Sequence, residues 1–389
     1  MTIRRKFFSN SIGSGFGQLA LRSGVPSYRI KQVTALTLIM SFIGAMLSGC
    51  SPLYVMRAAY EEGKILWRRE PIADLIQSSK VPPDTEEKLR LVLAARDYAR
   101  EALEFNVGGS YASYSYVDRP DLTYIVVAAP KTELKPYTWW FLIVGSVPYK
   151  GFFSKDEALA EIERLKADGY DTYLRTAAAF STLGWFDDPL LSHLLKYDKV
   201  LLSEIVFHEL FHNTLYVNGA GAFNESSANF VGHRAAIDFV RERFGADSAE
   251  HQRALLLWQE EREFAGFIAE VARELGGLYA SDVGREHKLR LREEVFARSQ
   301  AEWSRRIAER PAHRFHGFTR QPLNNAILMH YIVYLKDLDL FESLYQACGR
   351  NLRRTVQVLR EAVKTGDEPF QAMRAWLDRH RSDAATAMR

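Results

Sequence analysis

Two histidines and a glutamate lie close together in the segment 207–225, which reads FHELFHNTLYVNGAGAFNE. His208, Glu209 and His212 form the pattern HExxH. On an α-helix, residues four apart lie on one face, so both imidazoles can reach one metal ion. Glu209 can then contact a water molecule on that metal without being a ligand. Glu225 follows thirteen residues after His212. As a third ligand it would leave one zinc position open, which is typical of a catalytic site.

The alternative to a metal site is an ordinary amphipathic helix with two half-exposed histidines. Apolar residues surround the motif, however, and they predict a helix that is buried nearly all round: Leu201, Leu202, Ile205, Val206, Phe207, Leu210, Phe211, Leu215 and Tyr216. Buried imidazoles and carboxylates need partners, and a metal ion would supply one. The segment 218–222 breaks the helix, and we expect Asn224 to cap the next one. Glu225 would then lie in its first turn, with Asn229 one turn further on as an acceptor that orients an imidazole.

The elements around this motif predict an α+β protein. It is predominantly helical, with a small, mainly antiparallel sheet packed beside the HExxH helix. Before the motif we expect a helical stretch over 53–76 that is interrupted at Pro71, and a helix capped by Asp84 that continues to about Phe105. Strands are indicated at 111–116, 124–129, 139–147 and 170–178, with a helix from Ser154 to Gly169 between the last two.

After Glu225, the apolar residues recur with helical spacing throughout. One helix is expected to end at about Phe244, before Gly245. A long one follows after Ser248 and continues to about Leu275. A third covers 281–309, and shorter helices fill 323–379.

Composition is that of a globular protein with a sizeable core, since 47% of the 389 residues are hydrophobic and 25% are charged. We expect a single domain over 50–389, mixed α/β in 50–200 and helical in 201–389. Residues 1–49 contain six Lys/Arg and no acid, which leaves 45 Lys/Arg against 48 Asp/Glu in the remainder. That near-neutral balance gives no indication of a nucleic-acid partner.

Residues 1–49 are predicted to be a lipoprotein signal peptide. Arg29 and Lys31 precede an apolar run from Val33 to Leu47, which is short for a membrane span and suits an export signal. The alternative is an ordinary N-terminal membrane helix. The run ends in the lipobox-like sequence LSGC, so Cys50 is the expected lipid attachment site. By resemblance to lipoproteins, the Ser51 that follows it indicates the outer membrane, with the protein facing the periplasm.

Cys348, in an apolar run, is the only other cysteine. With Cys50 lipidated, no intramolecular disulfide is expected. Cys348 is therefore predicted to be a small buried side chain.

With these pieces in place, the chain resembles the bacterial putative aminopeptidase lipoprotein family, HExxH zinc metallopeptidases that are loosely gluzincin-like. The resemblance is carried by STLGWFDDP at 181–189, HELFH at 208–212 and FNES at 223–226, with weaker support from YKGFF at 149–153 and NNA at 324–326. It covers roughly 50–366. The resemblance implies a zinc-dependent peptidase of the cell envelope that acts on peptides, and specifically an aminopeptidase.

In such an enzyme His208, His212 and Glu225 would hold Zn²⁺, while Glu209 would move the proton of the attacking water. A donor must also meet the oxyanion, and Tyr216, Tyr331 and Tyr334 are the candidates; each is alternatively a core residue. His233 and His330 are expected to be surface or core residues.

An aminopeptidase also needs a strand edge for the substrate backbone and an acid for its α-amine. Thr182, Leu183 and Gly184 could supply the edge, and Asp187 or Asp188 the charge. Alternatively, both acids have no role in binding and simply lie at the start of an ordinary helix. Two other functions remain open, an endopeptidase with the same chemistry and a non-catalytic envelope lipoprotein that retains the fold.

Overall fold

The computed structural model describes residues 52–78, 80–118, 123–141, 145–177 and 187–387, and the side chains within 60–382. The signal peptide, Cys50 and the segment with Thr182, Leu183 and Gly184 lie outside the described residues. From Leu53 onwards the chain forms one compact unit. Among its described helices, none combines the length and the apolar character that a membrane span requires.

Three helices and a short strand open the described chain: α2 (Pro52–Trp67), β1 (Glu70–Pro71), α3 (Ile72–Ser78) and α4 (Pro83–Glu101). The predicted interruption at Pro71 is confirmed. The predicted cap at Asp84 is wrong, because α4 begins at Pro83 with no side-chain cap. Proline suits this first position, since its missing N–H would have no partner there.

The strands form three small sheets, and most of their pairs are antiparallel. In one, β3 (Thr123–Pro130) lies between β6 (Lys150–Phe152) and β7 (Tyr170–Ala177). In the second, β2 (Ser113–Ser115) pairs with β1 and, in parallel, with β8 (Leu190–Leu191). The third is the hairpin of β4 (Trp139–Phe141) and β5 (Gly145–Val147). The single strand predicted over 139–147 is therefore wrong, because this stretch folds back on itself.

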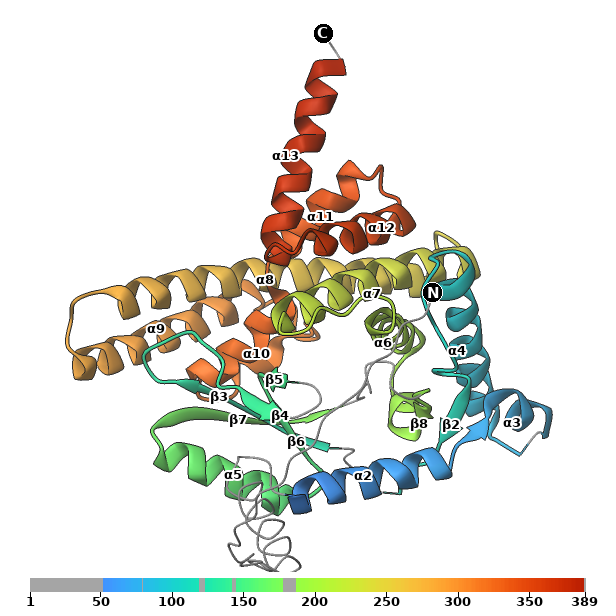
Figure 1. Ribbon diagram of the computed structural model, residues 1–389, viewed down its shortest axis with the longest axis horizontal. Coiled ribbons are helices and arrows are strands. Elements are labelled where there is room, and N and C mark those ends of the chain that lie inside the picture. Colours follow the sequence, from blue (N-terminus) through green and yellow to red (C-terminus); the bar gives the residue numbers. More distant parts are fainter. Residues whose placement is uncertain (1–51, 79, 119–122, 142–144, 178–186, 388–389) are drawn as a thin grey trace, which may run out of the picture. The chain divides into compact units, whose positions relative to one another are not determined.

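Two helices lie on opposite sides of strand β3 (Figure 1). Val126 and Ala128 pack with α5 (Lys155–Ala167) in one apolar cluster. Ile125 and Val127 pack on the other side with α10 (Asn325–Leu335). This is the side-chain alternation of a strand, and it makes β3 the centre of a helix–sheet–helix sandwich.

The remaining helices form the larger part of the fold. They are α6 (Lys199–His212), α7 (Gly221–Phe244), α8 (Ala249–Ala280), α9 (Arg285–Arg306), α11 (Leu338–Ala347), α12 (Leu352–Ala362) and α13 (Pro369–Ala387). The predicted end of α7 is confirmed, because Gly245 follows it with φ of 97°. Ser248 caps α8, with its hydroxyl accepting from the His251 N–H at 3.2 Å. The predominantly helical α+β class is confirmed.

Candidate metal centre

Helix α6 carries both histidines of the HExxH motif and begins at a well-formed cap. The Asp198 carboxylate accepts hydrogen bonds from the backbone N–H groups of Val200 and Leu201, at 3.0 and 2.9 Å. This satisfies donors that a helix N-terminus otherwise leaves unpaired. Apolar side chains on several faces of α6 are buried, as the sequence predicts. The helix therefore runs through the interior and holds His208 and His212 there.

One side chain fixes the turn between α6 and α7. The expected cap at Asn224 is wrong, because α7 begins earlier, at Gly221, without a side-chain cap. The Asn224 amide instead bonds both backbone groups of Val217: its Oδ1 accepts from the N–H and its Nδ2 donates to the C=O, each at 2.8 Å. A carboxamide offers that pair of groups side by side. The turn is thereby held in a form that directs Glu225 back towards α6.

A glycine lets α7 approach α6 closely at the level of the first histidine. A Cβ atom on Gly232 would lie 3.0 Å from the Glu204 carbonyl oxygen and 3.2 Å from the His208 Cβ. Gly232 is seven residues after Glu225, so the two lie on the same face of α7. The contact at Gly232 therefore also brings Glu225 close to the histidines.

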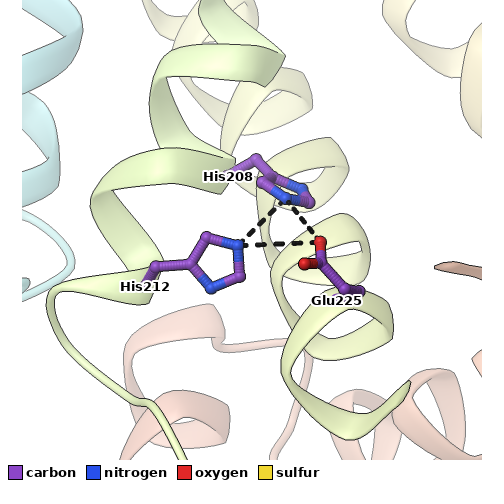
Figure 2. A group of neighbouring side chains, drawn as sticks. All are labelled: His208, His212 and Glu225. Carbon is purple, nitrogen blue, oxygen red and sulfur yellow. Dashed lines mark hydrogen bonds and ion pairs between the residues drawn. The ribbon is translucent and has the colours of Figure 1, made fainter. Parts of the chain in front are cut away.

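The three candidate ligands converge on one point (Figure 2). The Nε2 atoms of His208 and His212 are 3.2 Å apart, and the Glu225 Oε2 lies 3.5 Å from the first and 3.8 Å from the second. A circle through these three atoms has a radius of about 2.0 Å, close to the Zn–N and Zn–O bond lengths of about 2.0–2.2 Å. The group can hold a metal ion.

The protonation states of these side chains also suit a metal. Burial lowers the pKa of His212 to about 4, so this imidazole is neutral. Burial favours the protonated form of Glu225, but the hydrogen bond to His208 and the histidine charges outweigh it and hold the Glu225 pKa at about 2. Burial also opposes charge on His208, yet Glu225 and Glu209 leave its pKa raised. The carboxylate of Glu225 thus requires a positive charge beside it. A proton on a neighbouring histidine or a metal ion would supply that charge.

Glu209 follows the first ligand and is not part of the group of three. Burial raises its pKa to about 7, and the negative charges of Glu225 and Asp188 act in the same direction. A carboxylate with such a pKa can both accept and return a proton near neutral pH.

The comparisons with known proteins agree with this geometry. The family described as "Putative aminopeptidase" matches residues 53–373. The chain belongs to this family. No curated protein matches the chain, and no solved structure matches it.

Among the three candidate tyrosines of this aminopeptidase-family protein, Tyr334 lies nearest to the metal ligands in the described structure. Its ring stacks on His208, with centroids 6.3 Å apart and planes at 19°. Burial raises the Tyr334 pKa, so the phenol keeps its proton. Tyr216 lies near enough for the charge of Glu225 to raise its pKa further, after burial, but 38% of this residue is exposed.

Tyr331 occupies a different environment. Its ring packs against Phe264 at 4.9 Å, Phe318 at 5.9 Å and Phe315 at 6.2 Å. Burial raises its pKa, followed by the charges of Tyr173 and Glu261, neither of which belongs to the metal group. Tyr331 is therefore an aromatic core residue.

Asp187, the predicted acid for the substrate amine, is bound to a nearby turn. Its Oδ1 accepts a hydrogen bond from the Gly109 N–H at 2.7 Å. A Cβ on Gly109 would lie only 2.5 Å from the Asp187 carboxylate, so glycine is required at this position. Asp188 is buried, and its carbonyl accepts from the Tyr111 N–H at 2.7 Å. Neither acid starts a helix, because β8 follows them.

The predicted orienting role of Asn229 does not match its bonds. Its Nδ2 donates to Glu261 Oε1 at 2.7 Å and to the Tyr334 carbonyl at 3.3 Å. Asn229 thus fixes the backbone of α10, which carries the tyrosine stacked on His208. His233 and His330 are outside the ligand group of the described residues. His233 lies 3.3 Å from Glu204, while the ring of His330 packs against the Tyr334 ring at 5.3 Å.

Two further side chains near the metal ligands were not among the predicted site residues. Tyr149 is partly buried, and the charges of Glu225, Tyr334 and Arg175 act on it. Arg175 lies on β7 and donates from Nη2 to the Tyr334 hydroxyl at 3.2 Å. Arg175 gives a sequence signal in retrospect, since it is a lone cation in the strand sequence YDTYLRTA. For Tyr149, the only signal in the sequence is its place in the motif YKGFF at 149–153.

Proposed function

We propose that this protein is a zinc-dependent aminopeptidase. Membership of the family supports a peptidase. The observation that carries the proposal is the convergence of His208, His212 and Glu225 around one point, with Glu209 next to the first ligand. Two imidazoles and a carboxylate form a donor set that suits zinc, and they leave one of its four positions for chemistry.

The reaction is hydrolysis, in which water adds to the carbonyl carbon and the C–N bond breaks. Zinc bound by the three ligands supplies Lewis acidity for the water and the scissile carbonyl. Glu209 accepts one proton from the attacking water and transfers it to the nitrogen of the leaving amine. Tyr334 donates a hydrogen bond to the carbonyl oxygen as that oxygen becomes negative. The products are a carboxylic acid and a free amine, so the protons balance.

The exopeptidase assignment rests on the family description. An endopeptidase with the same ligands would use the same proton transfers. Two substrate types separate these activities, aminoacyl-coumarin amides with a free α-amine and internally quenched peptides with both ends blocked. An aminopeptidase cleaves the first type and leaves the second intact.

The proposed chemistry is tested with the full chain purified in detergent, as wild type, Glu209→Gln and Glu286→Gln. Glu286 is exposed on α9, so it is a matched control for the loss of one carboxylate. We expect one zinc per chain in all three proteins, activity in the wild type and the control, and a loss of roughly 10³-fold or more in Glu209→Gln. Full activity in Glu209→Gln would overturn the peptidase mechanism. An active wild type without bound metal would overturn the zinc requirement.

We also propose that the protein is a lipid-anchored component of the cell envelope that faces the periplasm from the outer membrane. The lipobox-like sequence before Cys50 supports this proposal. Labelled palmitate should be incorporated into the wild type and not into Cys50→Ala, with Cys348→Ala as the matched control. Equal labelling of wild type and Cys50→Ala would refute the anchor, and recovery of the wild type in inner-membrane fractions would refute the outer-membrane assignment.

A further inference from the structure

Arg175 of β7 is a partly buried cation with a buried Nε atom, and its surroundings are unusual for such a residue. Among the described residues, it donates a hydrogen bond to the Tyr334 hydroxyl, at 3.2 Å. No carboxylate of the described residues forms an ion pair with it, and its buried Nε has no acceptor there. A buried cation without a bonded anion is costly. Such a cost is typical of a residue retained for chemistry.

The register of the sheet places this cation beside the metal ligands. Arg175 pairs with Ile125 in the antiparallel ladder between β7 and β3. The face of β3 that carries Ile125 packs on α10, the helix that carries Tyr334. The guanidinium carbon lies 5.6 Å from the centroid of the Tyr334 ring. The charge of Arg175 also reaches Glu225.

The hydrogen bond between Arg175 and Tyr334 has only one possible direction. A guanidinium group donates and never accepts, so the phenol oxygen of Tyr334 is the acceptor. The single phenol proton must therefore point away from Arg175. The backbone of the same residue is held as well, because Asn229 donates to the Tyr334 carbonyl. Tyr334 is thus fixed at both ends, and its own hydroxyl proton has no acceptor among the described residues.

Charge explains why a cation at this position favours the reaction. Zinc and Arg175 repel each other, and Glu225 offsets only part of their joint positive charge. The surroundings of the three candidate ligands therefore favour an additional negative charge. The carbonyl oxygen acquires such a charge only as water adds to the carbonyl carbon. The interaction is consequently stronger in the transition state than with bound substrate.

From this geometry we infer that Arg175 is a positioning residue, which holds the Tyr334 hydroxyl as the donor to the oxygen of the scissile carbonyl. The inference rests on the proposed peptidase function. Arg175 acts through Tyr334 and does not itself transfer a proton. Tyr149 is the competing donor, since the charges of Glu225 and Arg175 act on it too.

The experiment measures kcat and KM of the full chain on an aminoacyl-coumarin substrate, with zinc content and thermal unfolding as further measurements. The variants are Tyr334→Phe, Arg175→Met, Arg175→Lys and the Tyr334→Phe/Arg175→Met double variant. Tyr331→Phe is the matched tyrosine control, because it lies one turn earlier on α10 among core aromatic rings. Arg234→Met is the matched arginine control, since Arg234 stacks on Trp258 at 5.1 Å outside the metal group.

We expect Tyr334→Phe to lower kcat roughly 10²-fold with KM changed less than about threefold. Arg175→Met should lower kcat at least about tenfold, and the double variant should be no slower than Tyr334→Phe alone. Arg175→Lys should keep part of the kcat that Arg175→Met loses. Zinc content should stay at the wild-type value, and both controls should keep the wild-type kcat.

The outcomes separate this inference from the proposed function. If Glu209→Gln remains active, the peptidase mechanism fails, and the role of Arg175 fails with it. If Glu209→Gln is inactive but the losses at 175 and 334 multiply in the double variant, or appear in KM, the positioning role is overturned while the peptidase stands. A 10²-fold loss of kcat in Tyr149→Phe with a normal Tyr334→Phe would assign the donor to Tyr149 and overturn the inference in the same way.

Discussion

Gly232 of α7 lies against His208 of α6 with no space for a side chain between them. A Cβ at position 232 would lie 3.2 Å from the Cβ of His208 and 3.0 Å from the carbonyl oxygen of Glu204. The second of these contacts is with backbone, which cannot rotate away. The distance between the two ligand-bearing helices is therefore set by the absence of a side chain, and the metal centre depends on a residue that does not contact the metal.

Gly232→Ala should consequently separate α6 from α7 and weaken metal binding. Overpacking of this kind costs about 1–3 kcal/mol of the free energy of unfolding. Thermal unfolding and the zinc dissociation constant provide the measurements. Gly266→Ala on α8 is the matched control, because a Cβ there meets nothing within 4 Å. Alanine favours a helix over glycine by roughly 0.5–1 kcal/mol, so the control should be as stable as wild type or more so. Wild-type zinc affinity in Gly232→Ala would contradict the argument.

Zinc should stabilise the folded protein through its three ligands. A ligand that binds only the folded state at about 100 times its Kd adds roughly 2.7 kcal/mol to the free energy of unfolding. Adding zinc to the chelated wild type should therefore raise the Tm. The same addition should have little effect on His208→Ala or Glu225→Gln. His287→Ala removes an exposed histidine of α9 and should respond like the wild type. An equal rise in His208→Ala would place the zinc elsewhere.

The ion pair between the buried carboxylate of Glu261 and Arg314 should make stability depend on acid pH. The Glu261 Oε2 lies 3.0 Å from the Arg314 Nη1. Burial opposes ionisation of Glu261, but Arg314 and His233 outweigh it and hold the Glu261 pKa at about 2. Because this pKa lies below its usual value of 4.5, the carboxylate stabilises the fold fully above about pH 4.5. That stabilisation is lost as the pH falls towards 2.

Glu261→Gln tests this dependence by chemical denaturation between pH 7 and pH 3. The variant should be less stable than wild type by several kcal/mol at pH 7, since Arg314 loses its buried partner. The difference between the two proteins should shrink as the pH falls below about 4.5. Glu302→Gln on α9, which removes a carboxylate paired with Arg306 near the surface, is the comparison and should change the stability much less. A difference that grows at low pH would contradict the depressed pKa of Glu261.

Asp187→Ala should affect stability and leave recognition of the substrate amine unchanged. Its carboxylate is already bonded to the Gly109 N–H at 2.7 Å, and the loss of that bond costs about 1 kcal/mol. We expect a lower Tm and a KM for aminoacyl-coumarin within about threefold of wild type. Asp118→Ala, which removes another exposed acid paired with an arginine, is the control. A tenfold rise in KM for Asp187→Ala alone would return this acid to the role that the sequence suggested.

The sequence was most informative where local chemistry decides the structure. The end of α7 at Gly245 follows from the backbone preferences of a few neighbouring residues. Asn224 shows the limit of that approach, because asparagine has several local partners. Its side chain bonds to the backbone of Val217 and does not cap the helix N-terminus. The local sequence does not indicate which of these two hydrogen-bond partners an asparagine will have.

Contacts between distant parts of the chain could not be predicted in the same way. Arg175 and Tyr334 are 159 positions apart, and their bond depends on how α10 lies on β3. Asn229 has the right position to follow Glu225 on the helix, yet its partners come from α8 and α10. The convergence of His208, His212 and Glu225 was predictable, because both histidines share one helical face and Glu225 lies after a single turn.

The three ligands span only 18 residues, from His208 to Glu225, and the Asn224 bonds close the turn inside that span. Loop closure over so short a distance is fast and costs little entropy. The hairpin of α6 and α7 would therefore bind a metal ion early during folding. Tyr334 reaches the hairpin only after the chain has continued through α8 and α9. In the proposed enzyme, metal binding would thus precede the arrival of Tyr334, and a nascent chain would carry zinc before it could cleave peptides.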